Sequence, residues 1–85
     1  MENNIKVLKF SASWCTPCKV LSATLKDVEG VKEIDIDQNR QLAVDHNVRS
    51  VPTLVFLQDG KEVERTTGSI PLAKYEEIIN RLNNK

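Results

Sequence analysis

Two cysteines three positions apart, Cys15 and Cys18, are the residues of this chain whose types and spacing can do redox chemistry. Such a pair can pass between a dithiol and a disulfide. The apolar residues Val7, Leu8 and Phe10 precede it and apolar residues at helical spacing follow it, so the pair lies where a strand gives way to a helix. The exposed N–H groups and positive end of a helix favour thiolate, the species that attacks disulfides. The placement predicts thiol–disulfide exchange.

Each residue of the motif has a predicted role. Cys15, at the start of the helix, is expected to be the more exposed cysteine and the nucleophile. Cys18 lies about one turn further along on the same side, where it can resolve a mixed disulfide between Cys15 and a substrate. Pro17 suits the first helical turn, because its missing N–H has no partner there. Lys19 adds a positive charge beside the pair.

Other uses of the two cysteines are less consistent with the sequence. A purely structural disulfide across so short a loop removes little entropy from the unfolded chain. A zinc or iron–sulfur site needs more ligands, and the sequence holds no third cysteine and only His46 as an imidazole. A metal shared between two copies of the chain stays open. Two inert cysteines would leave the neighbouring Trp14, Pro17 and Lys19 unexplained, so redox chemistry is favoured.

The composition predicts one small domain, residues 1–85, with a single core. The chain has 85 residues, 40% of them hydrophobic, and a formal net charge of zero. Acidic and basic residues are interspersed, which gives no footprint for nucleic acid, and no apolar stretch approaches the length that spans a membrane. Residues 1–9 carry charges and lack the apolar core of a signal peptide. We therefore expect a cytoplasmic monomer.

The hydrophobic pattern predicts the order strand, helix, strand, helix, strand, strand, helix. The first two strands are joined by a helix and should be parallel, with a right-handed crossover. Residues 53–57 are apolar on both faces, as in a central strand, and Asp59-Gly60 is typical of a hairpin. An α/β domain with a four-stranded mixed sheet and three helices follows. The predicted elements are 5–11, 18–29, 31–37, 40–47, 53–57, 61–67 and a last helix from Leu72 to Leu82.

Several segments resemble thioredoxins. They are Phe10-Ser11-Ala12-Ser13-Trp14-Cys15-Thr16-Pro17-Cys18-Lys19, Ile36-Asp37-Gln38-Asn39 and Val48-Arg49-Ser50-Val51-Pro52-Thr53-Leu54, followed by Asp59-Gly60 and Thr67-Gly68. The resemblance covers essentially the whole chain. It implies a minimal thioredoxin fold of order βαβαββα that begins at the family's second strand, which would leave 31–37 as an exposed edge.

The resemblance also implies roles for residues outside the cysteine motif. Cys15 would attack, Cys18 would resolve, and Val51–Pro52 would be a cis peptide packed against the pair. From the residues alone, Trp14 could instead fill the core, Pro52 could be an ordinary trans proline, and Gly68-Ser69 could be a simple turn. The substrate-docking surface implied by the family consists of Trp14, Thr16, Pro17, Val51, Pro52, Gly68 and Ser69.

Lys9 is the main departure from the family, because it occupies the position of a buried aspartate beneath the active site. The family's partner lysine on the neighbouring strand corresponds to Glu33, so the charges are exchanged. We expect Lys9 and Glu33 to form a reversed buried pair, since pairing reduces the cost of a buried ion. A cationic Lys9 would stabilise a nearby thiolate, and Glu33, through water, becomes the candidate base for Cys18. The alternative is that Lys9 snorkels to solvent.

These observations predict a small thiol–disulfide oxidoreductase that reduces protein disulfides. It binds no cofactor and no metal, because the Cys15–Cys18 disulfide is itself the redox group. By resemblance, its recharging partner is an NADPH-dependent flavoprotein reductase. Two alternatives stay open: a glutaredoxin-like enzyme recharged by glutathione, and a protein-binding module whose redox activity is incidental.

Overall fold

The computed structural model describes residues 4–84, and its elements follow the predicted order. Four strands form one sheet in the order β2-β1-β3-β4. β1 pairs with β2 in parallel and with β3 antiparallel, and β3 pairs antiparallel with β4. The α/β class and the mixed four-stranded sheet are confirmed. The bounds are β1 Ile5–Ser11, α1 Thr16–Thr24, β2 Val31–Asp35, α2 Arg40–Asp45, β3 Thr53–Gln58, β4 Lys61–Thr67 and α3 Leu72–Asn83.

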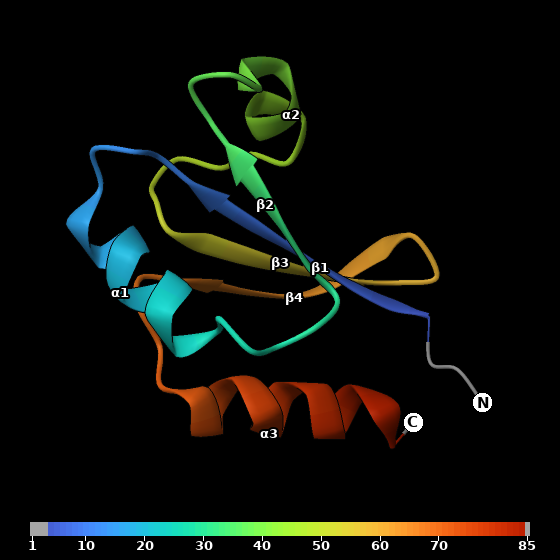
Figure 1. Cartoon of the computed structure of the whole chain (residues 1–85). Coiled ribbons are helices and arrows are strands. Elements are labelled where there is room, and N and C mark those ends of the chain that lie inside the picture. The colour runs from blue at the N-terminus through green and yellow to red at the C-terminus, as the bar shows by residue number, and fades with distance from the viewer. Residues whose placement is uncertain (1–3, 85) are drawn as a thin grey trace.

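Helices cover both faces of the sheet, α1 and α3 one face and α2 the other (Figure 1). The alternation of side chains along β1 explains this arrangement, because successive residues of a strand point to opposite faces. Val7 packs in a cluster with residues of α1 and α3, whereas Leu8 and Phe10 pack in a second cluster that contains Ala43 of α2. Lys9 therefore points toward the α1 and α3 face.

The edges of the sheet are β2, as the resemblance implied for 31–37, and β4. The interior position of β3 matches its composition, since Thr53 to Phe56 are buried without interruption. By contrast, β2 buries only Ile34, because one of its sides has no neighbouring strand.

The first helix differs from its predicted range of 18–29. It begins at Thr16 because Cys15 acts as its N-cap, and it ends at Thr24. Beyond Leu25 the backbone forms tighter turns, in which the N–H of Val28 donates to the carbonyl of Leu25. Gly30 then adopts φ +85° at the entry to β2, a conformation that glycine accepts without strain.

β2 and α2 are also shorter than predicted. β2 ends at Asp35, two residues early, because Asp35 starts a turn. The Asp35 carboxylate accepts a hydrogen bond from the N–H of Asp37, and its carbonyl accepts from the N–H of Asn39. α2 ends at Asp45, with His46 as its C-cap and Asn47 at φ +57°.

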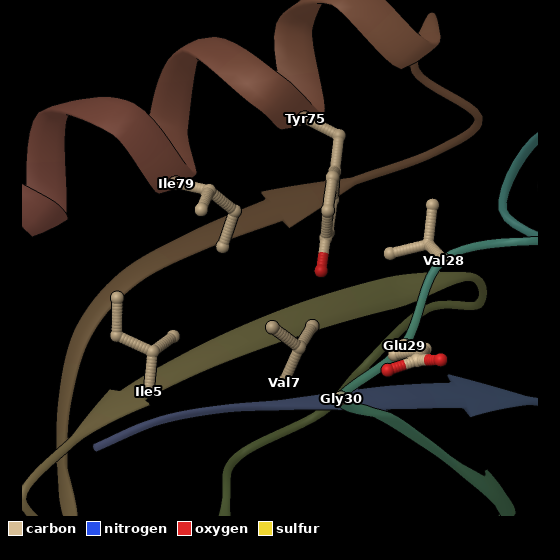
Figure 2. A pocket seen from close by; sticks show the side chains of 7 residues that line it. All are labelled: Ile5, Val7, Val28, Glu29, Gly30, Tyr75 and Ile79. Carbon is tan, nitrogen blue, oxygen red and sulfur yellow. The ribbon is translucent and has the colours of Figure 1, made fainter. Parts of the chain in front are cut away.

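A cavity of about 210 Å³ lies at the start of β1, at the opposite end of the strand from the cysteines. Figure 2 shows Tyr75 reaching from α3 with its hydroxyl directed toward β1, among apolar side chains such as Val7 and Ile79. Both ends of the described chain lie at this end of the molecule (Figure 1). The N–H of Asp59 donates to the carbonyl of Asn4, and the side chain of Gln58 donates to the carbonyl of Leu82.

Candidate active site

The two cysteines form a disulfide at the junction between β1 and α1, with their Cα atoms 5.2 Å apart. Cys15 has extended backbone angles and is the N-cap of α1, where its Sγ accepts a hydrogen bond of 3.1 Å from the N–H of Cys18. Pro17 occupies the first turn of the helix, as predicted. An N-cap position satisfies a free N–H group of the first turn, and a thiolate there accepts that bond more strongly than a thiol.

Both cysteines are buried, and Cys15 is only marginally the more exposed of the two. Its relative exposure is 4%, against 3% for Cys18. The Sγ of Cys15 turns inward to meet the N–H of Cys18, and both cysteines pack with Ala12. The exposed positions are instead its neighbours Trp14, Thr16 and Pro17, together with Lys19.

The loop before β3 lies against the cysteines. Val51 packs on their cluster, the Val51–Pro52 peptide bond is cis, and Pro52 is buried. The carbonyl of Pro52 accepts a hydrogen bond of 2.8 Å from the N–H of Gly68, which brings the segment after β4 to the same place. Ser69 follows as an exposed residue. The structure thus places Val51, Pro52 and Gly68 together.

Trp14 lies on the surface and does not fill the core. It is 65% exposed, and its indole N–H donates a 2.9 Å hydrogen bond to the carboxylate of Asp37, just beyond β2. Sequence reasoning missed this role of Asp37. A signal for Asp37 existed in the sequence. Asp37 follows β2 by two residues, and β2 lies beside β1, the strand that leads to Trp14.

Lys9 forms the expected ion pair with Glu33, but only one partner is buried. The two residues are opposite one another in the β1–β2 register, with 3.4 Å between Nζ and Oε1. The side chain of Lys9 is 6% exposed and that of Glu33 is 61% exposed. Glu33 reaches water because β2 is an edge strand, which corrects the prediction of a fully buried pair. Lys9 does not snorkel to solvent.

Two serines complete this group, and sequence reasoning missed both. The Nζ of Lys9 donates to the Oγ of Ser22 on α1, and the Oγ of Ser11 donates to Oε2 of Glu33 at 2.9 Å. A signal for Ser22 existed. A buried lysine requires polar partners, and Ser22 is one of two polar residues, with Thr24, between the buried Leu21 and Leu25.

Other candidate groups lie apart from this chemistry. Within residues 4–84, no three His, Cys, Asp or Glu side chains come together to hold a metal ion. His46 packs its ring against Phe10, with 5.6 Å between the ring centroids. In the same part of the chain, no helix is long and apolar enough to cross a membrane.

A disulfide at a strand-to-helix junction, packed against the loop of a buried proline, defines a thiol–disulfide oxidoreductase whose redox group is the disulfide itself. The family model described as thioredoxin matches residues 1–81. The chain belongs to the thioredoxin family, whose members act on disulfides of protein substrates.

Individual relatives agree with this assignment. A thioredoxin from Mycoplasmoides gallisepticum is 34% identical over 83 residues, covering 91% of this chain and 83% of the relative. One from Staphylococcus epidermidis is 30% identical, covering 95% and 85%. Among solved structures, a mutant thioredoxin from Halobacterium salinarum superimposes with a TM-score of 0.89 at 33% identity, covering 94% of this chain and 75% of that one. Fasciola hepatica thioredoxin gives 0.79 at 36% identity, with coverage of 94% and 82%.

Proposed function

We propose that this protein, acting as a single domain over residues 1–85, transfers two electrons from the Cys15/Cys18 dithiol to disulfides of cytoplasmic proteins. Cys15 is the attacking thiolate and Cys18 the resolving one. The observation that carries the assignment of roles is the hydrogen bond from the N–H of Cys18 to the Sγ of Cys15 at the helix N-cap. It stabilises negative charge on the first cysteine of the helix.

The reaction proceeds through one covalent intermediate. The Cys15 thiolate attacks one sulfur of the substrate disulfide, forming a mixed disulfide and releasing the other substrate sulfur as a thiolate. The Cys18 thiolate then attacks the Sγ of Cys15, which forms the Cys15–Cys18 disulfide and releases the second substrate thiolate. Two electrons pass to the substrate, and the two protons given up by the cysteines balance the two new substrate thiols.

The docking surface is proposed to surround the pair. Trp14 supplies an exposed aromatic side chain, and tryptophan is a frequent anchor at interfaces. The peptide groups beside the buried Pro52 would pair with an extended substrate segment. The complete surface consists of Trp14, Thr16, Pro17, Val51, Pro52, Gly68 and Ser69.

The return of the pair to its dithiol form requires two electrons and two protons from a reductant. We assign this role to an NADPH-dependent flavoprotein reductase, with glutathione as the alternative, in the cytoplasm, where such reductants keep thiols reduced. Trp14 lies beside the pair and serves as a fluorescence reporter of the equilibrium in graded thiol/disulfide buffers. A midpoint near roughly −270 mV favours the reductase, and one near about −200 mV favours glutathione.

The test of the assigned roles is reduction of a protein disulfide substrate such as insulin, with dithiothreitol as electron donor. Cys15→Ser should abolish turnover without forming a covalent complex. Cys18→Ser, reduced beforehand and mixed with the substrate after dithiothreitol has been removed, should stop at a Cys15–substrate mixed disulfide, detectable by mass spectrometry. Asn80→Ala, exposed on α3, is the control and should retain full activity. A mixed disulfide on Cys18 in the Cys15→Ser variant would reverse the assignment.

A double variant separates the enzyme from a protein-binding module whose redox activity is incidental. A double variant, Cys15→Ser with Cys18→Ser, should lose all turnover. If that variant still performs the biological role of the protein in its host, redox chemistry is incidental and the proposed function fails.

A further inference from the structure

The ion pair beneath the active site is held at both ends by serine hydroxyls. Lys9 donates to Ser22 on α1, and Glu33 accepts from Ser11 on β1. The ammonium and the carboxylate lie 3.4 Å apart, so together they form a local dipole with a fixed direction. The direction matters because it decides which charge faces the cysteines.

The positive end is directed to the helix that carries Cys18. Ser22 follows Cys18 by four residues on α1, so their side chains lie on the same face, slightly more than one turn or about 6 Å apart along the helix axis. The Nζ of Lys9 is bound to Ser22 and therefore lies about one turn below Cys18.

The two ends differ in their access to water. The side chain of Lys9 is 6% exposed, whereas that of Glu33 is 61% exposed on the edge strand. Water screens the carboxylate much more than the ammonium, because interactions weaken as the effective dielectric constant rises. The ammonium is therefore the less screened end of the pair.

From this geometry we infer that Ser22 is a positioning residue for the redox reaction: its hydrogen bond holds the ammonium of Lys9 on the α1 side, where it stabilises the Cys18 thiolate that resolves the mixed disulfide. The inference rests on the proposed roles of Cys15 and Cys18. It extends them by naming the residue that directs the charge of Lys9 toward the resolving cysteine.

The experiment measures the ultraviolet absorbance of thiolate in the reduced protein at fixed pH, in a Cys15→Ser background that leaves Cys18 as the only cysteine. Lys9→Met should lower the thiolate-to-thiol ratio of Cys18 about fivefold. Ser22→Ala should lower it about twofold to threefold, since the ammonium is then free to move toward Glu33. Ser22→Thr retains the hydroxyl and should leave the thiolate-to-thiol ratio of Cys18 at the value of the parent protein. Glu33→Gln removes the negative end and should raise it.

The thiolate-to-thiol ratio of Cys18 should fall in Ser22→Ala and rise in Glu33→Gln. These opposite changes distinguish a positioning role from a structural one, because loss of folding would shift the ratio of both variants in the same direction. Lys26→Met removes an exposed positive charge beyond α1 and is the charge-matched control, with no expected change. Ratios within experimental error of the parent for both Lys9→Met and Ser22→Ala would overturn the inference.

A second readout keeps the inference separate from the proposed function. With both cysteines present, release of the substrate from the Cys15 mixed disulfide should slow in Ser22→Ala by about 1.5-fold, while Cys15 attack changes less. The slowing is smaller than the loss of thiolate, because the thiolate that remains is more basic and a stronger nucleophile. A protein that reduces insulin normally but shows no change in Ser22→Ala contradicts the inference alone. A wild-type protein without any disulfide reductase activity contradicts the proposed function itself.

Discussion

Cys15 is both a member of the redox-active disulfide and the cap of α1. The two demands coincide, since the N–H that would otherwise lack a partner in the first turn also stabilises the sulfur charge. Substitutions of Cys15 can therefore separate its structural role as a helix cap from its role in disulfide exchange.

Replacing Cys15 by serine or by alanine should have different effects on stability. Both variants lack the nucleophile and the disulfide, but serine is a favourable N-cap and alanine is not. We expect the reduced Cys15→Ala protein to have a free energy of unfolding about 1 kcal/mol lower than Cys15→Ser. Urea unfolding of the two variants measures this difference. Equal stabilities would show that the cap contributes nothing.

Tyr75 should make the stability of the protein sensitive to alkaline pH. Burial raises the pKa of its phenol above the ordinary value of 10.0. A group whose pKa is raised in the folded state stabilises the fold below its unfolded pKa, and this contribution is lost as the pH rises through the folded pKa. Below about pH 10 the phenol is neutral in both states, and above that value its ionisation favours unfolding.

The variant Tyr75→Phe removes this titration. We expect it to unfold at nearly the wild-type urea concentration at pH 7, and to lose less stability than the wild type between about pH 9 and 11. Parallel pH profiles for the two proteins would contradict the role given to Tyr75.

At the scale of elements, Arg65 of β4 connects the hairpin to the end of α2. Its guanidinium donates to the carbonyls of His46 at 2.6 Å and Asn47 at 3.3 Å, and it pairs with Glu62 at 2.7 Å. A cation at the carboxyl end of a helix satisfies free carbonyl groups there. The hydrogen bond from Arg65 also lowers the pKa of Glu62 below its ordinary value.

Arg65→Met should therefore lower the free energy of unfolding by about 1–2 kcal/mol at pH 7. Because the pKa of Glu62 is lowered in the folded state, its contribution is present above the unfolded value of 4.5 and is lost as the pH falls through the folded one. The difference in free energy of unfolding between Arg65→Met and the wild type should therefore become smaller as the pH falls into the acid range. Arg81→Met, which breaks the exposed pair with Glu64, is the control with a smaller expected effect.

Sequence patterns predicted the existence and order of the elements better than their ends. The strand over Thr53 to Phe56 was recognisable because it is apolar on both faces. The end of α1 was not, since Val28 continues the apolar spacing of Leu21 and Leu25 although it lies beyond the helix. A residue can point to the core from a turn as well as from a helix, and periodicity alone does not separate these cases.

The site shows the same limit. Cys15 and Cys18 were identifiable from type and spacing, but the burial of both depends on contacts such as the hydrogen bond from the Cys18 N–H to the Cys15 sulfur. Glu33 was correctly paired with Lys9, whereas its exposure follows from the edge position of β2. Ser22 and Asp37 emerged only from contacts between elements distant in sequence.

At the scale of the whole molecule, the disulfide closes a very short loop, since its two cysteines are separated by 3 in sequence. Cross-linking stabilises mainly by restricting the unfolded chain, and the effect grows with loop length. The oxidised protein should be more stable than the reduced protein by about 2 kcal/mol or less. Urea unfolding in the two redox states measures the difference. A value well above this would show that reduction disturbs packing beyond the cysteines.

Both ends of the described chain lie far from the cysteines, around the start of β1 and the end of α3 (Figure 1). Asn4 is bonded to Asp59, and Leu82 to Gln58, at this same end. A protein anchored there to a bead, an electrode or a fused carrier presents its disulfide outward to the solution. Attachment near residue 4 or residue 84 thus yields an immobilised reductant whose disulfide faces away from the support.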